Sequence, residues 1–334
     1  MMTTRLPIAA RRHPVVTALA QGLESACGGL QLGPIVVAAS GGADSTAMVL
    51  ATQVLTERRE VDLEPIIVHV NHHLREDAGA DAEHVRRLCD QLGLLCECID
   101  VHPEGGGDDA RRCRYDALHA AAVRHGARHL LAAHHAEDQL ETIVAALGRG
   151  AGPEGLAGMM ATRSLAGDVQ LVRPLLPVTK AMLMDLCHAA DIEWRDDPTN
   201  VDPTTLRGRL RRDVLPVLEE LWPNAARRSA VNAPLVQAAA EALEREAASV
   251  FEVATSWPRA LLREAEPAIR STGLRRALLN GGLAADAIDT TRLAEAAAAI
   301  GDGSEHARRF EFNATTAIHI DANAVSIIQE TNDA

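Results

Sequence analysis

The chain has 334 residues, enough for two domains, and 47% of them are hydrophobic, as in an ordinary globular protein. Aromatic residues make up only 2% of the sequence, which argues against a domain that stacks nucleic-acid bases on a surface of aromatic rings. The formal net charge of -13 is also unlike that of a nucleic-acid-binding protein, although a local basic patch can still bind phosphates.

The six cysteines indicate free thiols rather than a disulfide framework or a zinc site. No two of them have the C-x-x-C spacing, and Cys96 and Cys98 are separated by a single residue. The N-terminal region lacks the uninterrupted apolar stretch of a signal peptide, and no run approaches the roughly 18 apolar residues of a membrane span. We therefore expect a cytoplasmic protein with reduced cysteines.

The first two hundred residues alternate between strand and helix patterns. This alternation predicts a doubly wound α/β fold, in which helices cover both faces of a parallel sheet and ligands bind at the carboxyl ends of the strands. The predicted strands are 34–39, 64–70, 94–101 and 129–133, and the predicted helices are 13–27, 44–58, 77–92, 108–125 and 136–147.

The rest of the chain changes character after a glycine-rich loop at 148–158. Most of it is helical and rich in Ala, and the tail at 304–329 is rich in β-formers, which predicts two or three short strands. We expect a boundary near 216–224, with a first domain over 1–216 and, over 217–334, a helical linker and a small α+β domain. The other predicted elements are a strand at 169–173 and helices at 179–190, 207–221, 225–250, 257–280 and 287–299.

Residues 40–45, SGGADS, lie between the first predicted strand and the helix that follows it. A strand, a Gly-Gly turn and a helix N-terminus form an anion site, because glycines let the backbone approach a phosphate and the helix dipole favours negative charge. The spacing is not that of a Walker A loop. It resembles the pyrophosphate loop of enzymes that split ATP between its α and β phosphates, and the alternative is an ordinary strand–helix turn.

Polar residues also follow the second and fourth predicted strands. The second strand ends in the sequence HVNHH at 69–73, whose histidines suggest a metal, but no distant ligand completes a zinc site. After the fourth strand, Asp138 and Glu141 lie on one face near a helix N-terminus, where carboxylates either hold Mg²⁺ or only interact with the helix dipole. Asp44 and Asp138 both begin helices after strands of the same sheet, so we expect their sites to converge.

Arginine dominates the positive charges, and the only lysine is Lys180. Several arginines are concentrated between positions 207 and 228. They form either a phosphate-binding patch or a solvated helix face that pairs with nearby acids, and the sequence leaves both interpretations open. The cluster consists of Arg207, Arg209, Arg211, Arg212, Arg227 and Arg228, and the nearby acids are Asp213, Glu219 and Glu220.

Seven motifs taken together resemble those of the tRNA(Ile)-lysidine synthase family. Their order and spacing agree with the family from about residue 34 to residue 224. SGGxDS alone marks a broad superfamily, whereas the set of HHxxDQxET, RGxGxxGL and RPLL is highly specific. The motifs are SGGADS (40–45), HVNHHLR (69–75), ARRCRY (110–115), AAHHAEDQLET (132–142), GRGAGPEGLAGM (148–159), RPLL (173–176) and DDPTN (196–200).

The resemblance implies an adenine-nucleotide-alpha-hydrolase-like fold and an ATP-dependent ligase. In that family, ATP adenylates O2 of cytidine 34 in an isoleucine tRNA with a CAU anticodon, and the ε-amine of free lysine then displaces AMP at C2 to form lysidine. The resemblance therefore implies ATP and Mg²⁺ as cofactors and the tRNA and L-lysine as substrates. The oligomeric state stays open, with a dimer among the alternatives.

The resemblance also assigns functions to individual positions. Catalytic roles fall on Asp44, His134, Asp138 and Arg114, and Asp44 and Asp138 are in addition the expected Mg²⁺ ligands. Gly208 departs from the family, which usually has Asn there, and a glycine removes that amide and loosens a helix start. The nucleotide-binding positions are Ser40, Gly41, Gly42, Ala43, Asp44, Ser45, His69 and Asn71. Further matched positions are His72, Arg75, Arg111, Glu141, Thr142, Arg149, Gly150, Gly152, Gly155, Leu156, Asp197, Asn200, Arg207 and Arg211.

Three other functions are weighed against this one. A tRNA thiolase would use the same ATP loop, but sulfur transfer in the related cysteine-dependent groups relies on paired C-x-x-C thiols, which the sequence lacks. A glutamine-dependent amidotransferase synthetase would require a glutaminase domain, of which the sequence shows no sign. The third is a nucleotide-binding regulatory protein of the stress-protein type. The second acidic motif and the second domain argue against it, and ATP–pyrophosphate exchange distinguishes it from the enzymes.

Overall fold

The computed structural model describes residues 5–59, 61–73, 78–195 and 204–329. Within these ranges, no helix combines the length and the apolar character that are needed to cross a lipid bilayer. Internal contacts divide the chain into two compact units.

Unit 1 comprises Met1–Val144 and Gly158–Ala233, and unit 2 comprises Ala145–Ala157 and Pro234–Ala334. Almost all of the glycine-rich loop therefore belongs to unit 2. The second division falls inside a long helix, α11 (Ala225–Val250). The domain boundary expected at residues 216–217 stays a prediction.

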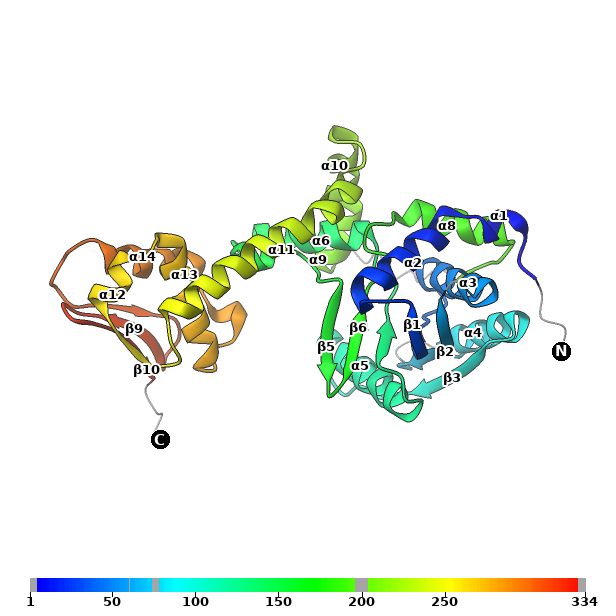
Figure 1. Cartoon of the computed structure of the whole chain (residues 1–334), viewed down its shortest axis with the longest axis horizontal. Helices are drawn as coiled ribbons and strands as arrows, with labels where there is room; N and C mark the ends of the chain where they lie inside the picture. The colour runs from blue at the N-terminus through cyan, green and yellow to red at the C-terminus, as the bar shows by residue number, and fades with distance from the viewer. Residues whose placement is uncertain (1–4, 60, 74–77, 196–203, 330–334) are drawn as a thin grey trace. The chain divides into compact units, whose positions relative to one another are not determined.

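A six-stranded sheet forms the centre of unit 1 (Figure 1). The strands are β1 (Gln31–Ala38), β2 (Asp62–Asn71), β3 (Leu95–Asp100), β4 (His129–Leu131), β5 (Thr162–Ala166) and β6 (Val169–Val172). Their order is β3-β2-β1-β4-β6-β5, and all pair in parallel except β5, which forms an antiparallel hairpin with β6. The predicted fold class is confirmed, and β5 is an additional edge strand that the sequence pattern does not predict.

Helices pack on both faces of this sheet. They are α1 (Ile8–Arg11), α2 (Pro14–Cys27), α3 (Ala43–Arg58), α4 (Ala78–Leu92), α5 (Gly107–Arg124), α6 (Ala136–Gly148) and α8 (Lys180–Ala190). In β1, Ile35 and Val37 face a core shared with α2, α3, α4 and α8, whereas Val36 faces a second core shared with α5. Because both faces are covered, the carboxyl ends of the strands are where polar loops can form a site.

The helical segment predicted at 207–221 is divided into three parts. It consists of α9 (Leu206–Arg209), a π-helical turn (Leu210–Val214) and α10 (Leu215–Leu221). A π-helical turn widens the helix locally and shifts the direction of its side chains, and such turns are frequent at functional sites. Here the turn carries Arg211 and Arg212.

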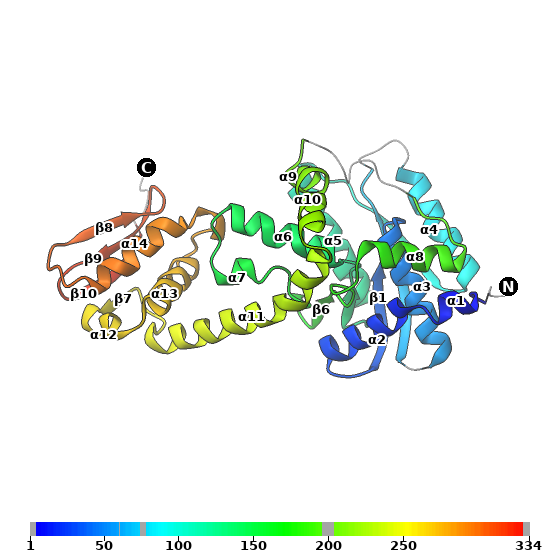
Figure 2. The same ribbon diagram turned by 90° about the horizontal axis from the view of Figure 1, so that it is seen from above.

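Unit 2 contains a small antiparallel sheet packed on helices. Its remaining elements are α7 (Pro153–Leu156), β7 (Ser256–Pro258), α12 (Arg259–Glu264), α13 (Pro267–Asn280), a 3₁₀ turn (Ala285–Ala287), α14 (Thr290–Gly301), β8 (Arg308–Glu311), β9 (Thr316–Ile320) and β10 (Ala324–Gln329). The strand order is β7-β10-β9-β8, and α14 lies against β8 and β9 (Figure 2). The tail thus contains three short strands, which confirms the prediction.

The single helix predicted over 257–280 is wrong. The segment contains the edge strand β7 and two helices, α12 and α13. Pro258 precedes the first helix and Pro267 begins the second, and the residue before a proline is disfavoured in a helix. The helical periodicity therefore extends across two breaks that the prolines impose.

Candidate active site

The SGGADS loop connects β1 to α3 and is braced by its own serine hydroxyls. The hydroxyl of Ser45 donates to the carbonyl of Gly42 (3.1 Å) and accepts the N–H of Ser40 (3.1 Å). Gly41 has a φ of +88°, which L side chains rarely adopt. Because α3 begins at Ala43, the N–H groups of its first turn, which have no helical partners, lie at the end of this loop. This is the geometry of an anion site at a helix N-terminus.

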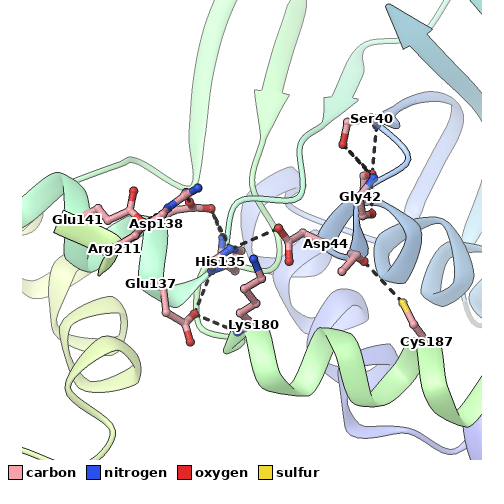
Figure 3. A network of polar contacts seen from close by, with 12 residues as sticks. Ser40, Gly42, Asp44, His135, Glu137, Asp138, Glu141, Lys180, Cys187 and Arg211 are labelled. Carbon is pink, nitrogen blue, oxygen red and sulfur yellow. Dashed lines mark hydrogen bonds and ion pairs between the residues drawn. The ribbon is translucent and has the colours of Figure 1, made fainter. Parts of the chain in front are cut away.

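His135 is the centre of a cluster of carboxylates at the start of α6 (Figure 3). Its Nε2 lies 3.5 Å from Oδ2 of Asp44 and 3.4 Å from Oδ2 of Asp138. Its Nδ1 lies 2.9 Å from Oε2 of Glu137. Burial alone would lower the pKa of His135, but its three carboxylate neighbours raise the pKa to about 10. The imidazole is therefore a cation at neutral pH and joins the SGGADS loop to α6.

Arg211 neutralises carboxylates on the first two turns of α6. Its guanidinium pairs with Asp138 (2.7 Å) and with Glu141, whose side chain is 1% exposed. Burial disfavours the charged form of Asp138, but the nearby charges of His135 and Arg211 lower its pKa overall. Burial raises the pKa of Glu141 even though Arg211 opposes the shift. Oε2 of Glu141 is buried and has no hydrogen-bond partner among the described residues, and Nε of Arg207 forms an ion pair with it at 4.0 Å.

His134 lies in a different environment, one that is rich in arginine. Burial is the largest influence on its pKa and lowers it to about 4. Asp138 opposes this shift, and the charges of Arg173, Arg111 and Arg207 add to it. His134 is therefore neutral at pH 7. Its Nδ1 is buried and lacks a hydrogen-bond partner in the described part of the chain.

The only tyrosine of the chain, Tyr115 on α5, lies between two arginines. The guanidinium carbons of Arg111 and Arg163 are 5.2 Å and 5.6 Å from its ring centroid, within the range of a cation–π contact. Burial of the Arg114 guanidinium, together with the charges of Arg111 and Arg207, lowers its pKa, while Tyr115 opposes the shift. Within the described ranges, no carboxylate pairs with Arg111 or Arg114, so this surface has uncompensated positive charge.

Two residues predicted to bind nucleotide at the end of β2 make contacts within the protein. Nδ1 of His69 lies 2.8 Å from the carbonyl oxygen of Ala39, directly before the SGGADS loop, and burial lowers its pKa. The amide of Asn71 donates to Asp100 (3.1 Å) and accepts the N–H of His73 (3.1 Å). These side chains therefore fix the end of β2 next to the loop.

Comparisons with known proteins show which family the chain belongs to. A sequence model of the PP-loop domain, an ATP-binding domain, matches residues 15–218. A tRNA(Ile)-lysidine synthase of Salinispora arenicola is 40% identical over 247 residues, which cover 72% of this chain and 71% of that protein. The chain belongs to the tRNA(Ile)-lysidine synthase family.

Two further comparisons define the extent of the similarity. The tRNA(Ile)-lysidine synthase of Alkalilimnicola ehrlichii is 42% identical over 217 residues, which cover 64% of this chain and 47% of that protein, so the chain spans about half the length of this relative. The solved structure of the U34-tRNA thiolase NcsA from Methanococcus maripaludis has a TM-score of 0.54 at 14% identity, over 71% of this chain and 89% of that one. The second similarity concerns the fold alone.

The structure brings together some of the residues that resemblance to the tRNA(Ile)-lysidine synthase family selects. Asp44 and Asp138 converge on one imidazole, as their places at one sheet edge predict. No hydrogen bond or ion pair within the described residues joins Arg114 to either carboxylate. The catalytic roles of these residues stay predictions. Three matched positions lie outside the described residues: Arg75, Asp197 and Asn200.

Sequence reasoning selected His134 and missed the central position of His135. Two adjacent histidines after a strand differ in the direction of their side chains, and the local pattern does not show which of them faces the loop. Arg211 was matched to the family, but its ion pair with Glu141 joins residues 70 positions apart. No local sequence signal could have shown this pair.

A magnesium ion fits at Asp44 better than at Asp138. Oδ1 of Asp44 is buried and has no hydrogen-bond partner in the described ranges, and a carboxylate oxygen is the ligand type that Mg²⁺ prefers. Both oxygens of Asp138 are engaged by Arg211 and His135. Among the described residues, no group of three or more His, Cys, Asp or Glu side chains is arranged as a metal site. Mg²⁺ would therefore depend on phosphate oxygens for most of its ligands.

The glycine-rich loop, which the family resemblance also selects, is anchored within unit 2. Arg275 on α13 pairs there with Glu154 of the loop (2.9 Å). In unit 1, after the loop, the side-chain amide of Gln139 binds the N–H and the carbonyl of Met159 (2.7 and 3.2 Å). Because Gln139 adjoins Asp138 on α6, Met159, which follows the loop, is fixed beside the acidic cluster.

Proposed function

We propose that the chain ligates lysine to C2 of cytidine 34 in the isoleucine tRNA with a CAU anticodon. ATP first adenylates O2 of the base with release of pyrophosphate, and the ε-amine of lysine then displaces AMP to form lysidine. The observation that carries this proposal is the convergence of the SGGADS loop and the acidic start of α6 on His135, in a chain of this family.

The SGGADS loop would stabilise the charge that develops during adenylation. Negative charge appears on the oxygen between the α and β phosphates and on the departing pyrophosphate, and each well-placed donor is typically worth ~3–4 kcal/mol of the barrier. The N–H groups at the start of α3 are such donors. Oδ1 of Asp44 would hold Mg²⁺, which neutralises phosphate charge when it is bound. His135, whose Nε2 lies 3.5 Å from Oδ2 of Asp44, would orient this carboxylate.

The acidic pair on α6 is suited to the cationic amino acid. Asp138 and Glu141 lie on one face of the helix, and Oε2 of Glu141 has no hydrogen-bond partner among the described residues. The ε-amine of lysine must lose a proton before it attacks C2. Because burial raises the pKa of Glu141, this carboxylate is the better proton acceptor of the two.

The arginine-rich surface around Tyr115 is suited to the RNA. Arg111 and Arg163 flank the ring of Tyr115 and have no carboxylate partner among the described residues, so their guanidinium groups are available for phosphates. This local charge accounts for how a protein with a net charge of -13 would bind a polyanion.

Radiolabelled lysine and a CAU-anticodon tRNA transcript test the proposal. We expect label in the tRNA only when ATP is present, with release of AMP and pyrophosphate that depends on the tRNA. Incorporation of sulfur from cysteine in place of lysine would assign a thiolase. Binding of ATP without any pyrophosphate exchange would instead assign a nucleotide-binding regulatory protein.

A further inference from the structure

Lys180 is the only lysine among the 33 Lys and Arg residues of the chain. The other 32 are arginines. The two residues are not equivalent, because lysine carries a compact ammonium on a flexible stem, whereas arginine carries a planar group with a fixed fork of donors. Lys180 therefore differs in shape and in hydrogen-bonding geometry from every arginine of the chain.

The backbone of Lys180 is fixed to the acidic cluster of the site. It is the first residue of α8, and its N–H donates to Oε2 of Glu137 (2.9 Å), the same oxygen that contacts His135. The N–H of Ala136 also donates to the carbonyl of Val178 (2.9 Å). Two hydrogen bonds thus hold the start of α8 and the start of α6 together next to His135.

The side chain of Lys180 extends toward His135 and Asp44 (Figure 3). Within the described residues, no carboxylate forms an ion pair with its ammonium, and the residue is exposed. Further along α8, the thiol of Cys187 donates to the carbonyl of Ala43 (3.6 Å), so the helix lies beside the first residue of α3. The ammonium is therefore a solvent-accessible cation next to the phosphate loop.

We infer that Lys180 is a phosphate-binding residue, whose ammonium contacts the β or γ phosphate of ATP and then the departing pyrophosphate. This inference rests on the proposed function, because it requires ATP at the SGGADS loop. Asp44 is a poorer partner for the ammonium, since its carboxylate already faces the positive His135. A cation at this position would also repel the ammonium of the lysine substrate, which is suited to Asp138 and Glu141.

The sole lysine makes a direct labelling experiment feasible. The full chain is treated with a neutral acetylating ester, with or without nucleotide, and the extent of acetylation at Lys180 is measured by mass spectrometry. The α-amine of the chain is the internal control. We expect saturating ATP or pyrophosphate to slow acetylation of Lys180 by at least ~10-fold, the scale of one charge-assisted hydrogen bond, while AMP and the α-amine show little change.

Variants distinguish a direct contact between Lys180 and phosphate from a bound nucleotide that only shields the lysine from the reagent. Lys180→Met should raise the Kd for ATP by at least ~10-fold and leave the Kd for AMP unchanged, and Lys180→Arg should retain part of the affinity. Arg128→Met, which removes an exposed cation just before the amino end of β4, is the matched control and should bind ATP normally.

Equal ATP affinity in Lys180→Met and wild type, or acetylation that ATP does not slow, would overturn the inference while ATP binding stands. Failure of the wild-type protein to bind ATP would overturn the proposed function as well.

Discussion

Buried charge is arranged differently in the two units. In unit 2, Arg259 is 1% exposed, and its guanidinium is satisfied by main-chain carbonyls and one carboxylate. A buried guanidinium with a full set of acceptors is a structural element, because it ties several segments together. The acceptors are the carbonyls of Ala299, Ile300, Ser304 and Asp321 and the carboxylate of Asp302.

In unit 1, several buried polar side chains of the site are only partly hydrogen-bonded. Asp44, Glu141 and His134 each keep one buried polar atom without a hydrogen-bond partner among the described residues. An unpaired buried polar group typically costs about 1–3 kcal/mol, so groups of this kind beside the site are candidates for completion by a ligand. Among the described residues of unit 1, buried atoms of Arg11, His84 and His129 also have no hydrogen-bond partner, and these residues do not belong to the cluster around His135. Among the described residues of unit 2, Arg270 also has buried nitrogens without a hydrogen-bond partner, and nothing in the structure explains them. Arg259 therefore illustrates a structural use of buried charge, and the cluster around His135 is the candidate for a functional one.

Asp44→Ala should have the largest effect. The change removes the carboxylate that faces both the phosphate loop and His135, so tRNA-dependent pyrophosphate release should fall by at least ~1,000-fold. The fold should remain intact, because Asp44 is partly exposed and does not belong to a core. Steady-state kinetics and circular dichroism check the two halves of this prediction. Wild-type kinetics with normal ATP binding would remove Asp44 from the mechanism.

Asp138→Asn should reduce adenylation by about 100-fold. The amide keeps the shape of the side chain but removes the charge that His135 and Arg211 share. If Asp138 also helps to hold Mg²⁺, the concentration of Mg²⁺ needed for half-maximal rate should rise. Pyrophosphate release is measured against Mg²⁺ concentration. A variant that is only less heat-stable, with full activity per folded molecule, would assign Asp138 to the helix start alone.

Arg259→Met should change stability rather than chemistry. It leaves several buried carbonyls of unit 2 without a donor and should lower the free energy of unfolding by about 2 kcal/mol. ATP affinity should be that of the wild type. Arg308→Met, a more exposed partner of the same Asp302, is the control and should change stability by at most about 0.5 kcal/mol. A loss of ATP binding in Arg259→Met would break the distinction between the two units.

Replacing Arg209 and Arg212 with Gln should have the smallest effect. Both side chains are exposed, and the one ion pair of Arg212 within the described part of the chain is with its neighbour Asp213. If they contact tRNA phosphates, the dependence of log K for tRNA on log salt should become shallower by about 1 to 2 units, with ATP affinity unchanged. An unchanged salt slope in filter-binding titrations would place these arginines on a solvated helix face.

The sequence predicted the sheet and the loop because both depend on local patterns. Apolar runs mark β1 and β2, and the Gly-Gly turn marks the phosphate loop. The convergence of Asp44 and Asp138 also followed, since parallel strands end at one edge. What local patterns could not show is the direction of a side chain, as at His135, or an ion pair between distant segments, as at Arg211.

Helical periodicity also does not predict where a helix is interrupted when the composition stays the same on both sides. The segment 257–280 keeps a helical pattern across Pro258 and Pro267, so strand β7 and the division between α12 and α13 were missed. The edge strand β5 is short and largely exposed, and it therefore lacks the apolar run that marked the buried strands. Strand β7 depends on its pairing with β10, and strand β5 depends on its pairing with β6.

Mass analysis of nucleoside 34 tests the central claim most directly. The protein is incubated with ATP, lysine and a tRNA transcript that carries either C34 or U34, and the nucleosides are then separated and weighed. The account predicts that C34 gains one lysine residue and that U34 is unchanged, because uridine has a carbonyl at C4 and a protonated N3 where cytidine has an amine and an N3 lone pair. Lysine on U34, or sulfur in place of lysine on C34, would contradict it.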